Sequence, residues 1–322
     1  MAGLFSFMEG YNQFMKEHAD PRTKDWFLSG QPGRLILILV TYFYFCTKVG
    51  PRYMKGRKPY ELKKTIQFYN FLQVVGSAYL FYEGLAAGWT EYSFTCQPVV
   101  PGEKGQRMAR GVWLYFICKL IELLDTVFFV LRKKFNQVSY LHLYHHTLMP
   151  VCAWIGVTFL PGGHGTLLGL INCFIHVIMY SYYFLSSLGP QYQKYLWWKK
   201  HVTALQMFQF CIVFWHNFQV LFRPCDYPKF LNFLLATQAA YFFYLFGCFY
   251  VNSYLKNKNK SKSQDNKSIT AQNGHAQNGK VQNGVILENG SHANGNAIEN
   301  GSLPNGNIKE NGVSQNGKTK VQ

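Results

Sequence analysis

Three histidines lie within five residues of one another, at positions 142, 145 and 146. On an α-helix, spacings of three and four residues place side chains on one face. Imidazoles gathered on one face can act as a base, as a nucleophile or as metal ligands. His142, His145 and His146 are therefore the first candidates for a reactive centre. The structural alternative is a set of hydrogen-bonded histidines at a membrane interface.

A group of charged residues interrupts the apolar segment that precedes these histidines. Lys119, Glu122 and Asp125 recur every three residues within 112–131, and Thr126 lies beside them. Each such charge costs about 2.5–3.5 kcal/mol at the centre of a membrane helix, so charged residues there are typical of functional sites. A self-neutralising patch between helices is the alternative.

Two later apolar segments also carry polar side chains at helical spacing. His176 follows Asn172 by about one turn, and Thr203, Gln206 and Gln209 form a third stripe. Polar residues can simply hold membrane helices together. Taken together, however, the stripes predict a helical bundle with a polar interior, suited to a substrate with a long apolar part and a reactive polar head.

The composition indicates a membrane protein with a polar tail. Of the 322 residues, 48% are hydrophobic and 18% aromatic, and only 15% are charged. The mean hydropathy of −0.07 hides this, because the tail dilutes the average. The net charge of +17 lies in short loops and in the tail, with no nucleic-acid-binding module. We therefore expect anionic lipid or an anionic substrate as partner, and no nucleic acid.

Seven apolar segments approach the length of roughly 20 residues that a membrane helix needs. The sequence thus predicts an all-α membrane protein with an N-terminal luminal or interfacial segment at 1–33, a seven-helix domain at 34–255 and a tail at 256–322. The loops after the first, third and fifth segments are rich in Lys and Arg, as is the tail, which places the tail in the cytosol. The predicted helices cover 34–49, 65–87, 112–131, a segment from the histidines to 159, 166–187, 202–222 and 230–255.

The tail repeats Asn-Gly at short, irregular intervals without alternating hydrophobic residues, which predicts disorder. Lys318 and Lys320 stand fifth and third from its end. This spacing fits a di-lysine retrieval signal for the endoplasmic reticulum, with a chance ending as the alternative.

Four motifs, in this order and spacing, resemble the signature of the very-long-chain fatty acid elongases. The resemblance covers about 34–255, and the segments 137–139 and 195–199 also resemble this family, whereas the Asn-Gly tail does not. The motifs are Lys119-x-x-Glu122-x-x-Asp125-Thr126, His142-x-x-His145-His146, His176-x-x-Met179-Tyr180-x-Tyr182-Tyr183 and Thr203-x-x-Gln206-x-x-Gln209.

The resemblance implies a 3-oxoacyl-CoA synthase of the endoplasmic reticulum membrane. Such an enzyme joins an acyl-CoA to malonyl-CoA and releases carbon dioxide and CoA. It also implies seven transmembrane helices, six of them forming a barrel around a closed-ended acyl tunnel, and no cofactor or metal besides the two substrates. The expected partners are membrane lipid, the reductases and dehydratase of the elongation cycle, and a second copy of the chain.

We expect His145 to attack the acyl thioester and to carry the acyl group. His142 and His176 would orient the thioester or stabilise negative charge, and His146 would handle protons. A direct reaction, with His145 only as a base, remains open. The further expected contacts are Lys119 to substrate, held by Glu122 and Asp125; Arg132, Lys134 and Lys199 to the CoA phosphates; and Gln137, Tyr182, Thr203 and Gln206 along the polar neck.

Two of the eight cysteines lie in predicted loops on the non-cytosolic side. In an oxidising lumen, Cys96 and Cys225 could pair, and the resemblance supports such a bridge. The chain has no Cys-x-x-Cys pair, so a zinc site has no support.

Two other functions use similar residues. A membrane desaturase or hydroxylase with two irons also uses His-x-x-His-His, but needs about eight histidines in several such motifs. This chain has ten histidines and no second motif of this kind, and three of the ten lie near the termini, at 18, 275 and 292. A transporter or receptor with seven helices could use the buried charges and histidines as a proton relay.

Overall fold

The structure, a computed structural model, describes residues 2–256. Within this range every regular element is a helix. The elements are α1 (Ala2–His18), α2 (Pro32–Tyr44), η1 (Phe45–Val49), α3 (Gly50–Met54), α4 (Lys63–Gly84), η2 (Leu85–Trp89), α5 (Gly102–Ile121), α6 (Leu124–Leu131), η3 (Phe135–Gln137), α7 (Tyr140–Phe159), α8 (Thr166–Leu188), η4 (Pro190–Tyr195), α9 (Lys199–Val220), α10 (Lys229–Tyr250) and η5 (Val251–Lys256).

All seven predicted membrane segments are helical in the structure. Among residues 2–256, three continuous helices are long and apolar enough to cross a membrane by length and composition, namely Pro32–Met54, Thr166–Leu188 and Lys229–Lys256. The other segments carry polar stripes or charged ends, which lower their mean hydropathy. Helix α1 was not predicted from the sequence, and the predicted tail lies outside the described residues from position 257 onward.

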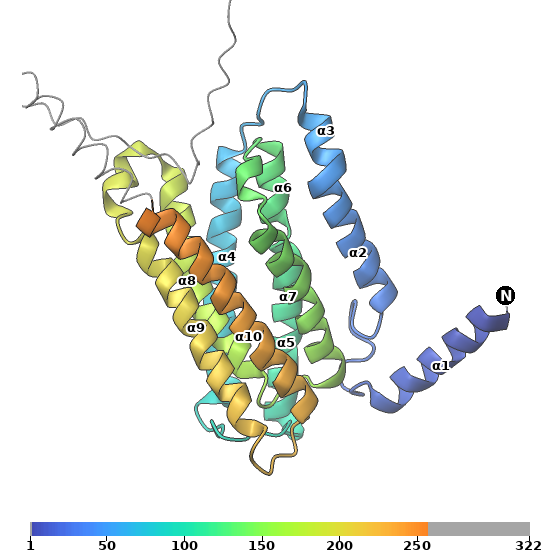
Figure 1. Ribbon diagram of the computed structural model, residues 1–322. Coiled ribbons are helices and arrows are strands. Elements are labelled where there is room, and N and C mark those ends of the chain that lie inside the picture. The colour runs from blue at the N-terminus through green and yellow to red at the C-terminus, as the bar shows by residue number, and fades with distance from the viewer. Residues whose placement is uncertain (1, 257–322) are drawn as a thin grey trace, which may run out of the picture. The chain divides into compact units, whose positions relative to one another are not determined.

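The long helices pack in pairs along much of their length. Helix α4 runs beside α8, α9 beside α10, and α5 beside α7 (Figure 1). Helix α2 joins the bundle through α7, and its buried Leu35 and Leu39 enter a cluster built around Phe116 and Val157. This arrangement brings the predicted polar stripes of α5, α7, α8 and α9 into one bundle.

The outer surface of the bundle is rich in large apolar side chains. Leu37 on α2, Phe68 on α4 and Trp215 on α9 are 67%, 64% and 64% exposed. A water-soluble protein rarely leaves so many side chains of this kind in contact with solvent. Helices satisfy their own backbone hydrogen bonds, so such a surface is suited to lipid.

The loops at one end of the bundle are held together by several long-range contacts. Cys96, between η2 and α5, forms a disulfide with Cys225, between α9 and α10, with their Cα atoms 5.7 Å apart. Next to it, the rings of His164 and His216 stack at 3.6 Å, and each ring forms a hydrogen bond to the backbone carbonyl of the other residue. The His164 amide also donates to the carbonyl of Gln97, the residue after Cys96, at 2.7 Å. The loop before α8 is therefore connected both to α9 and to the disulfide loop.

Candidate active site

A break between α5 and α6 positions the central ion pair. Helix α5 ends at Ile121 and α6 begins at Leu124, and between them the Asp125 amide donates to the Glu122 carbonyl at 3.1 Å, a tighter three-residue turn. The Lys119 ammonium donates to both carboxylate oxygens of Glu122, at 2.8 and 2.9 Å. Both side chains are at least 95% buried. The charged residues predicted from the sequence therefore form a buried pair.

Helix α8 supplies two further partners for this pair. Asn172 Oδ1 accepts hydrogen bonds from Lys119 Nζ at 2.8 Å and from the Tyr115 hydroxyl at 3.0 Å. His176 Nδ1 lies 3.2 Å from Glu122 Oε1 and 3.5 Å from Lys119 Nζ. A carboxylate only accepts hydrogen bonds and gives the shorter contact, which assigns the proton to Nδ1. Nε2 of His176 then carries a lone pair.

Asp125 forms a hydrogen bond with α8. The sequence pattern predicts that Asp125 helps to hold Lys119, with which it interacts electrostatically, and its carboxylate also accepts a hydrogen bond from the Tyr180 hydroxyl at 2.8 Å. The Tyr180 ring in turn packs edge-on against Tyr69 of α4. Asp125 lies six residues after Lys119, beyond the break between α5 and α6, so the two carboxylates of this segment serve different neighbours.

The three histidines occupy the first turns of α7. The Ser139 hydroxyl caps this helix by accepting the backbone N–H of His142. His142 Nε2 shares a hydrogen bond of 2.8 Å with Thr126 Oγ1, which shares another of 2.7 Å with the Tyr42 hydroxyl. The ring of His146 lies 4.2 Å from that of His142 and 5.3 Å from that of His145. Tyr42 and Thr126 thus fix the orientation of His142.

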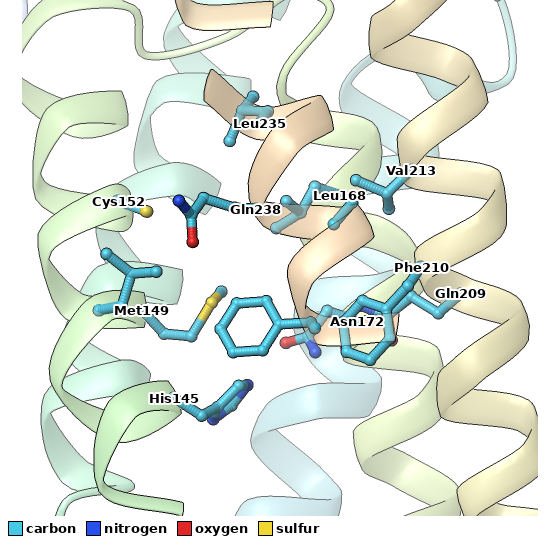
Figure 2. Close-up of a pocket in the computed structure, with 13 residues that line it drawn as sticks. His145, Met149, Cys152, Leu168, Asn172, Gln209, Phe210, Val213, Leu235 and Gln238 are labelled. Carbon is cyan, nitrogen blue, oxygen red and sulfur yellow. The ribbon is translucent and has the colours of Figure 1, made fainter. Parts of the chain in front are cut away.

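His145 lines a cavity of about 40 Å³ (Figure 2). Its ring packs edge-on against Phe242 of α10, and Figure 2 places it at one end of the cavity, with Leu235 at the other. Asn172, which binds Lys119, lines the same cavity, as does Gln209. The cavity therefore brings an imidazole close to a buried network of charged and polar groups, which suits attack on a carbonyl or transfer of a proton.

Comparison with known proteins identifies the family. The sequence profile of the ELO: GNS1/SUR4 family matches residues 27–262. This chain belongs to that family. A very long chain fatty acid elongase of Aedes aegypti is 45% identical over 264 residues, covering 81% of this chain and 74% of that protein. Very long chain fatty acid elongase 7 of Drosophila melanogaster is 44% identical over 277 residues, with 85% and 83% covered. Human very long chain fatty acid elongase 1 is 45% identical over 254 residues, with 77% and 90% covered.

In this family member, the predicted CoA-binding residues lie at one end of the helices. Arg132 follows the last turn of α6, Lys134 directly precedes η3 and Lys199 is the first residue of α9. Since α6 ends and α9 begins at the same end of the bundle, the three cations share that end. Gln137 is the last residue of η3 and lies three residues before Tyr140, the first residue of α7. The histidine cluster starts at this same end.

Of the remaining residues predicted to line the polar neck, Tyr182 lies on α8, and Thr203 and Gln206 lie on α9. Tyr182 of α8 is buried and packs edge-on against Trp198, next to Lys199. Gln206 donates to the Met179 sulfur at 3.4 Å, and Thr203 shares a hydrogen bond of 3.4 Å with the Tyr254 hydroxyl.

Among residues 2–256, no group of three or more His, Cys, Asp or Glu side chains is arranged to hold a metal ion.

Sequence reasoning did not identify several residues of this network. Tyr42 of α2 and Tyr115 of α5 each complete a hydrogen-bond chain, although aromatic residues are common throughout these helices. Gln73 of α4 donates to the Tyr69 hydroxyl at 2.9 Å and is buried. A signal for α4 was present, because Asn70, Gln73 and Ser77 form a polar stripe within an apolar segment, and all three are buried.

Proposed function

We propose that this protein catalyses the condensing step of fatty acid elongation. It would join an acyl-CoA to malonyl-CoA to give a 3-oxoacyl-CoA, carbon dioxide and CoA. The family assignment and the names of its relatives support fatty acid elongation. The observation that best supports the condensing step is the position of His145. It shares a cavity with Asn172, the residue bound to Lys119.

In the proposed reaction, an imidazole nitrogen of His145 attacks the thioester carbonyl of the acyl-CoA. The C–N bond forms as the C–S bond breaks, and the departing CoA thiolate is protonated with the proton that the imidazole loses. Malonyl-CoA then loses carbon dioxide, and the resulting enolate attacks the acyl carbonyl. As the new C–C bond forms, the acyl–imidazole bond breaks, and a proton from solvent restores the neutral ring of His145.

The neighbouring residues take different parts in these steps. Because Glu122 accepts the Nδ1 proton of His176, Nε2 is the nitrogen that can take up a proton during acyl transfer. The resulting N–H can stabilise negative charge on the thioester oxygen. His142, held by Thr126, orients the thioester, and His146 relays protons next to His145. Arg132, Lys134 and Lys199 bind the CoA phosphates, and Gln137, Tyr182, Thr203 and Gln206 line the path between them and the histidines.

Lys119 supplies a positive charge to the substrate, and the residues around it hold that charge in position. Its ammonium already donates to Glu122 and Asn172, so its charge is fixed in place before substrate arrives. A preorganised positive charge in a water-excluded site stabilises a developing oxyanion more strongly than the same charge in water. Asp125 holds Tyr180 and the packing of α4 against α8.

We propose that all seven helical segments cross the membrane, and that six surround a closed-ended acyl tunnel. The apolar outer surface and the buried polar stripes support this arrangement. The three cations at the α6–α9 end would face the cytosol, and the disulfide end would face an oxidising lumen. In this orientation the protein lies in the endoplasmic reticulum membrane, and its tail, with Lys318 and Lys320, extends into the cytosol. A second copy and the reductases and dehydratase of the cycle are the proposed partners.

The test of condensation uses microsomes that contain the full chain. Labelled malonyl-CoA and a series of acyl-CoAs are supplied without NADPH, with and without a metal chelator. We expect a labelled 3-oxoacyl product that survives the chelator. If inserted and folded protein forms no product from any acyl-CoA, the proposal is contradicted. If product forms only without the chelator, the reaction requires a metal.

A second experiment tests the acyl-enzyme. Purified protein is mixed with labelled acyl-CoA in the absence of malonyl-CoA, quenched and analysed by mass spectrometry. We expect an acyl group on His145, absent from His145→Ala and present in a control with His201→Ala, a histidine at the start of α9. An active enzyme that never carries the acyl group would instead favour direct attack with His145 as a base.

A further inference from the structure

A second and larger cavity adjoins the one that contains His145. It measures about 150 Å³, whereas a single buried water needs only about 10–15 Å³ by this measure. Both cavities are lined by the same five residues where they meet, so the second leads away from His145 into the bundle. These shared residues are Met149, Cys152, Leu168, Leu235 and Gln238.

Five glycines line this far cavity, among them Gly111 on α5, Gly156 on α7 and Gly169 on α8. A Cβ atom added at Gly169 would lie 3.9 Å from the Tyr115 ring, an ordinary contact. A Cβ atom added at Gly111 would meet no other atom within 4 Å, and one at Gly156 would meet only Val112 Cγ1, at 3.8 Å. Glycine within a helix is less stable than alanine. Neither close packing nor an unusual backbone angle requires glycine at these two positions.

Two other glycines of the same wall differ in this respect. A Cβ atom at Gly84 would lie 2.8 Å from Leu170 Cδ1, and one at Gly165 would lie 2.6 Å from the Tyr227 hydroxyl. There, close packing accounts for the glycine. At Gly111 and Gly156, no neighbouring atom occupies the place of the missing side chain, and both residues line the cavity.

The depth of these glycines can be estimated along α7. Gly156 lies about three helical turns beyond His145, a rise of roughly 16 Å. An extended alkyl chain advances roughly 1.25 Å per carbon, so this level corresponds to about 13 carbons. Leu160, at the end of α7, lies roughly 22 Å from His145, or about 18 carbons. It lines the far end of the cavity together with Trp89 and Tyr227.

We propose that Gly111 and Gly156 determine the length of acyl chain that this protein accepts. The space beside them holds the part of a saturated chain beyond about the thirteenth carbon, and Leu160 and Trp89 stop its methyl end near the eighteenth. The preferred acceptor is thus an unbranched acyl-CoA of about 16–18 carbons. This inference rests on the proposed condensing function.

The chemistry of the far cavity fits this occupant. Most of the lining is aliphatic or aromatic, and several of its polar side chains already have hydrogen-bond partners. Glu83 accepts two hydrogen bonds from Arg107, at 2.7 and 3.0 Å, and the Trp89 indole donates to the Thr166 hydroxyl at 2.9 Å. An alkyl chain demands no hydrogen bonds from its surroundings, so it fits a wall of this kind.

The experiment measures 3-oxoacyl product from labelled malonyl-CoA with saturated acyl-CoAs of increasing length. Gly156→Leu and Gly111→Leu should lower the preferred length by several carbons and reduce the rate with the longest wild-type substrates about tenfold or more. Rates with short acyl-CoAs should remain within about twofold. Gly76→Leu on α4 and Gly247→Leu on α10 are matched controls, because a Cβ atom meets nothing within 4 Å there and neither glycine lines a cavity.

Three outcomes decide the proposal. A folded Gly156→Leu variant with the wild-type length profile overturns it, while wild-type protein that forms no product overturns the condensing function itself. If the leucine variants fail to fold, Gly156→Ala and Gly111→Ala replace them, since alanine favours the helix and should still shift the profile downward. Leu160→Ala, which enlarges the far end, should raise the preferred length by about two carbons, and an unchanged length would also overturn the proposal.

Discussion

Two of the carboxylate–cation pairs in the described part of the chain lie in very different surroundings. The pair of Lys119 with Glu122 is only 2% and 5% exposed and is enclosed by further partners, including Asn172. The pair of Arg107 with Glu83, at the far cavity, leaves the arginine 41% exposed. The first pair lies in an environment where an unpaired charge is very unfavourable, whereas water can still reach the second.

The two cavities differ in size and in the groups that reach them. Both are lined mainly by apolar side chains, but His145, Asn172 and Gln209 line the first, whereas the far cavity is larger and is bounded by glycines. The first end of the bundle is thus organised for chemistry, and the second for fitting an alkyl chain. Substitutions at the two ends should therefore change different observables.

The largest expected effect comes from breaking the buried pair with Glu122→Gln. This leaves the Lys119 charge without its carboxylate, which should lower the free energy of unfolding by about 3–5 kcal/mol. Condensation should fall about 100-fold or more. Thermal unfolding in detergent and the condensation assay measure the two losses. In the control, Lys119→Met with Glu122→Leu, stability should recover while activity stays lost, and recovered activity would contradict a catalytic role for the pair.

The second largest effect is expected from removing the disulfide, which lies at the opposite end of the bundle from the histidine cluster. Cys96→Ser should lower the free energy of unfolding by about 2–5 kcal/mol, because the bridge closes a loop of 129 residues in the unfolded chain. Condensation at low temperature should change little, since the disulfide lies far along the bundle from His145. Cys211→Ser, which removes an exposed free cysteine, is the control for thermal unfolding. A large loss of activity at unchanged stability would contradict the claim that the disulfide end contributes to stability and not to the reaction.

A smaller effect is expected for Thr126→Val at the reaction end. The substitution keeps the shape of the side chain but leaves His142 Nε2 and the Tyr42 hydroxyl without their shared partner, at a cost of about 1–3 kcal/mol. The condensation rate should fall about tenfold while the preferred acyl length stays the same. Tyr42→Phe, which keeps the bond between Thr126 and His142, should lose less. A shift in acyl length would show that the two ends are coupled.

The sequence was sufficient to predict where the seven apolar helical segments lie, although not α1, because each apolar segment must satisfy its own backbone hydrogen bonds. It also identified most of the polar side chains that meet in the interior, since helical spacing places Lys119 and Glu122 on the same side of one segment. The break between α5 and α6 was not predicted. Beyond this break, Asp125 accepts a hydrogen bond from Tyr180, whereas Glu122 pairs with Lys119. Residue spacing alone does not predict these different hydrogen-bond partners.

Contacts between helices were harder to predict than the helices themselves. Tyr42 reaches Thr126 across 84 positions of sequence, and Tyr115 reaches Asn172 across 57. No pattern within one helix marks such a pair, because each tyrosine could equally face lipid. The far cavity illustrates the same point, since Gly111 and Gly156 resemble any helix glycine until the neighbouring side chains are placed.

The smallest effect tests the comparison of the two ion pairs directly. Arg107→Gln removes the cation beside Glu83, but the partly exposed site lets water solvate the remaining carboxylate, so the loss of stability should be small and well below that of Glu122→Gln. The condensation rate with short acyl-CoAs should be unchanged. Thermal unfolding at low and high salt provides the measurement, because a screened pair loses its contribution as salt rises whereas a buried pair does not. A loss as large as that of Glu122→Gln, insensitive to salt, would mean that the far cavity is sealed from water as tightly as the reaction end.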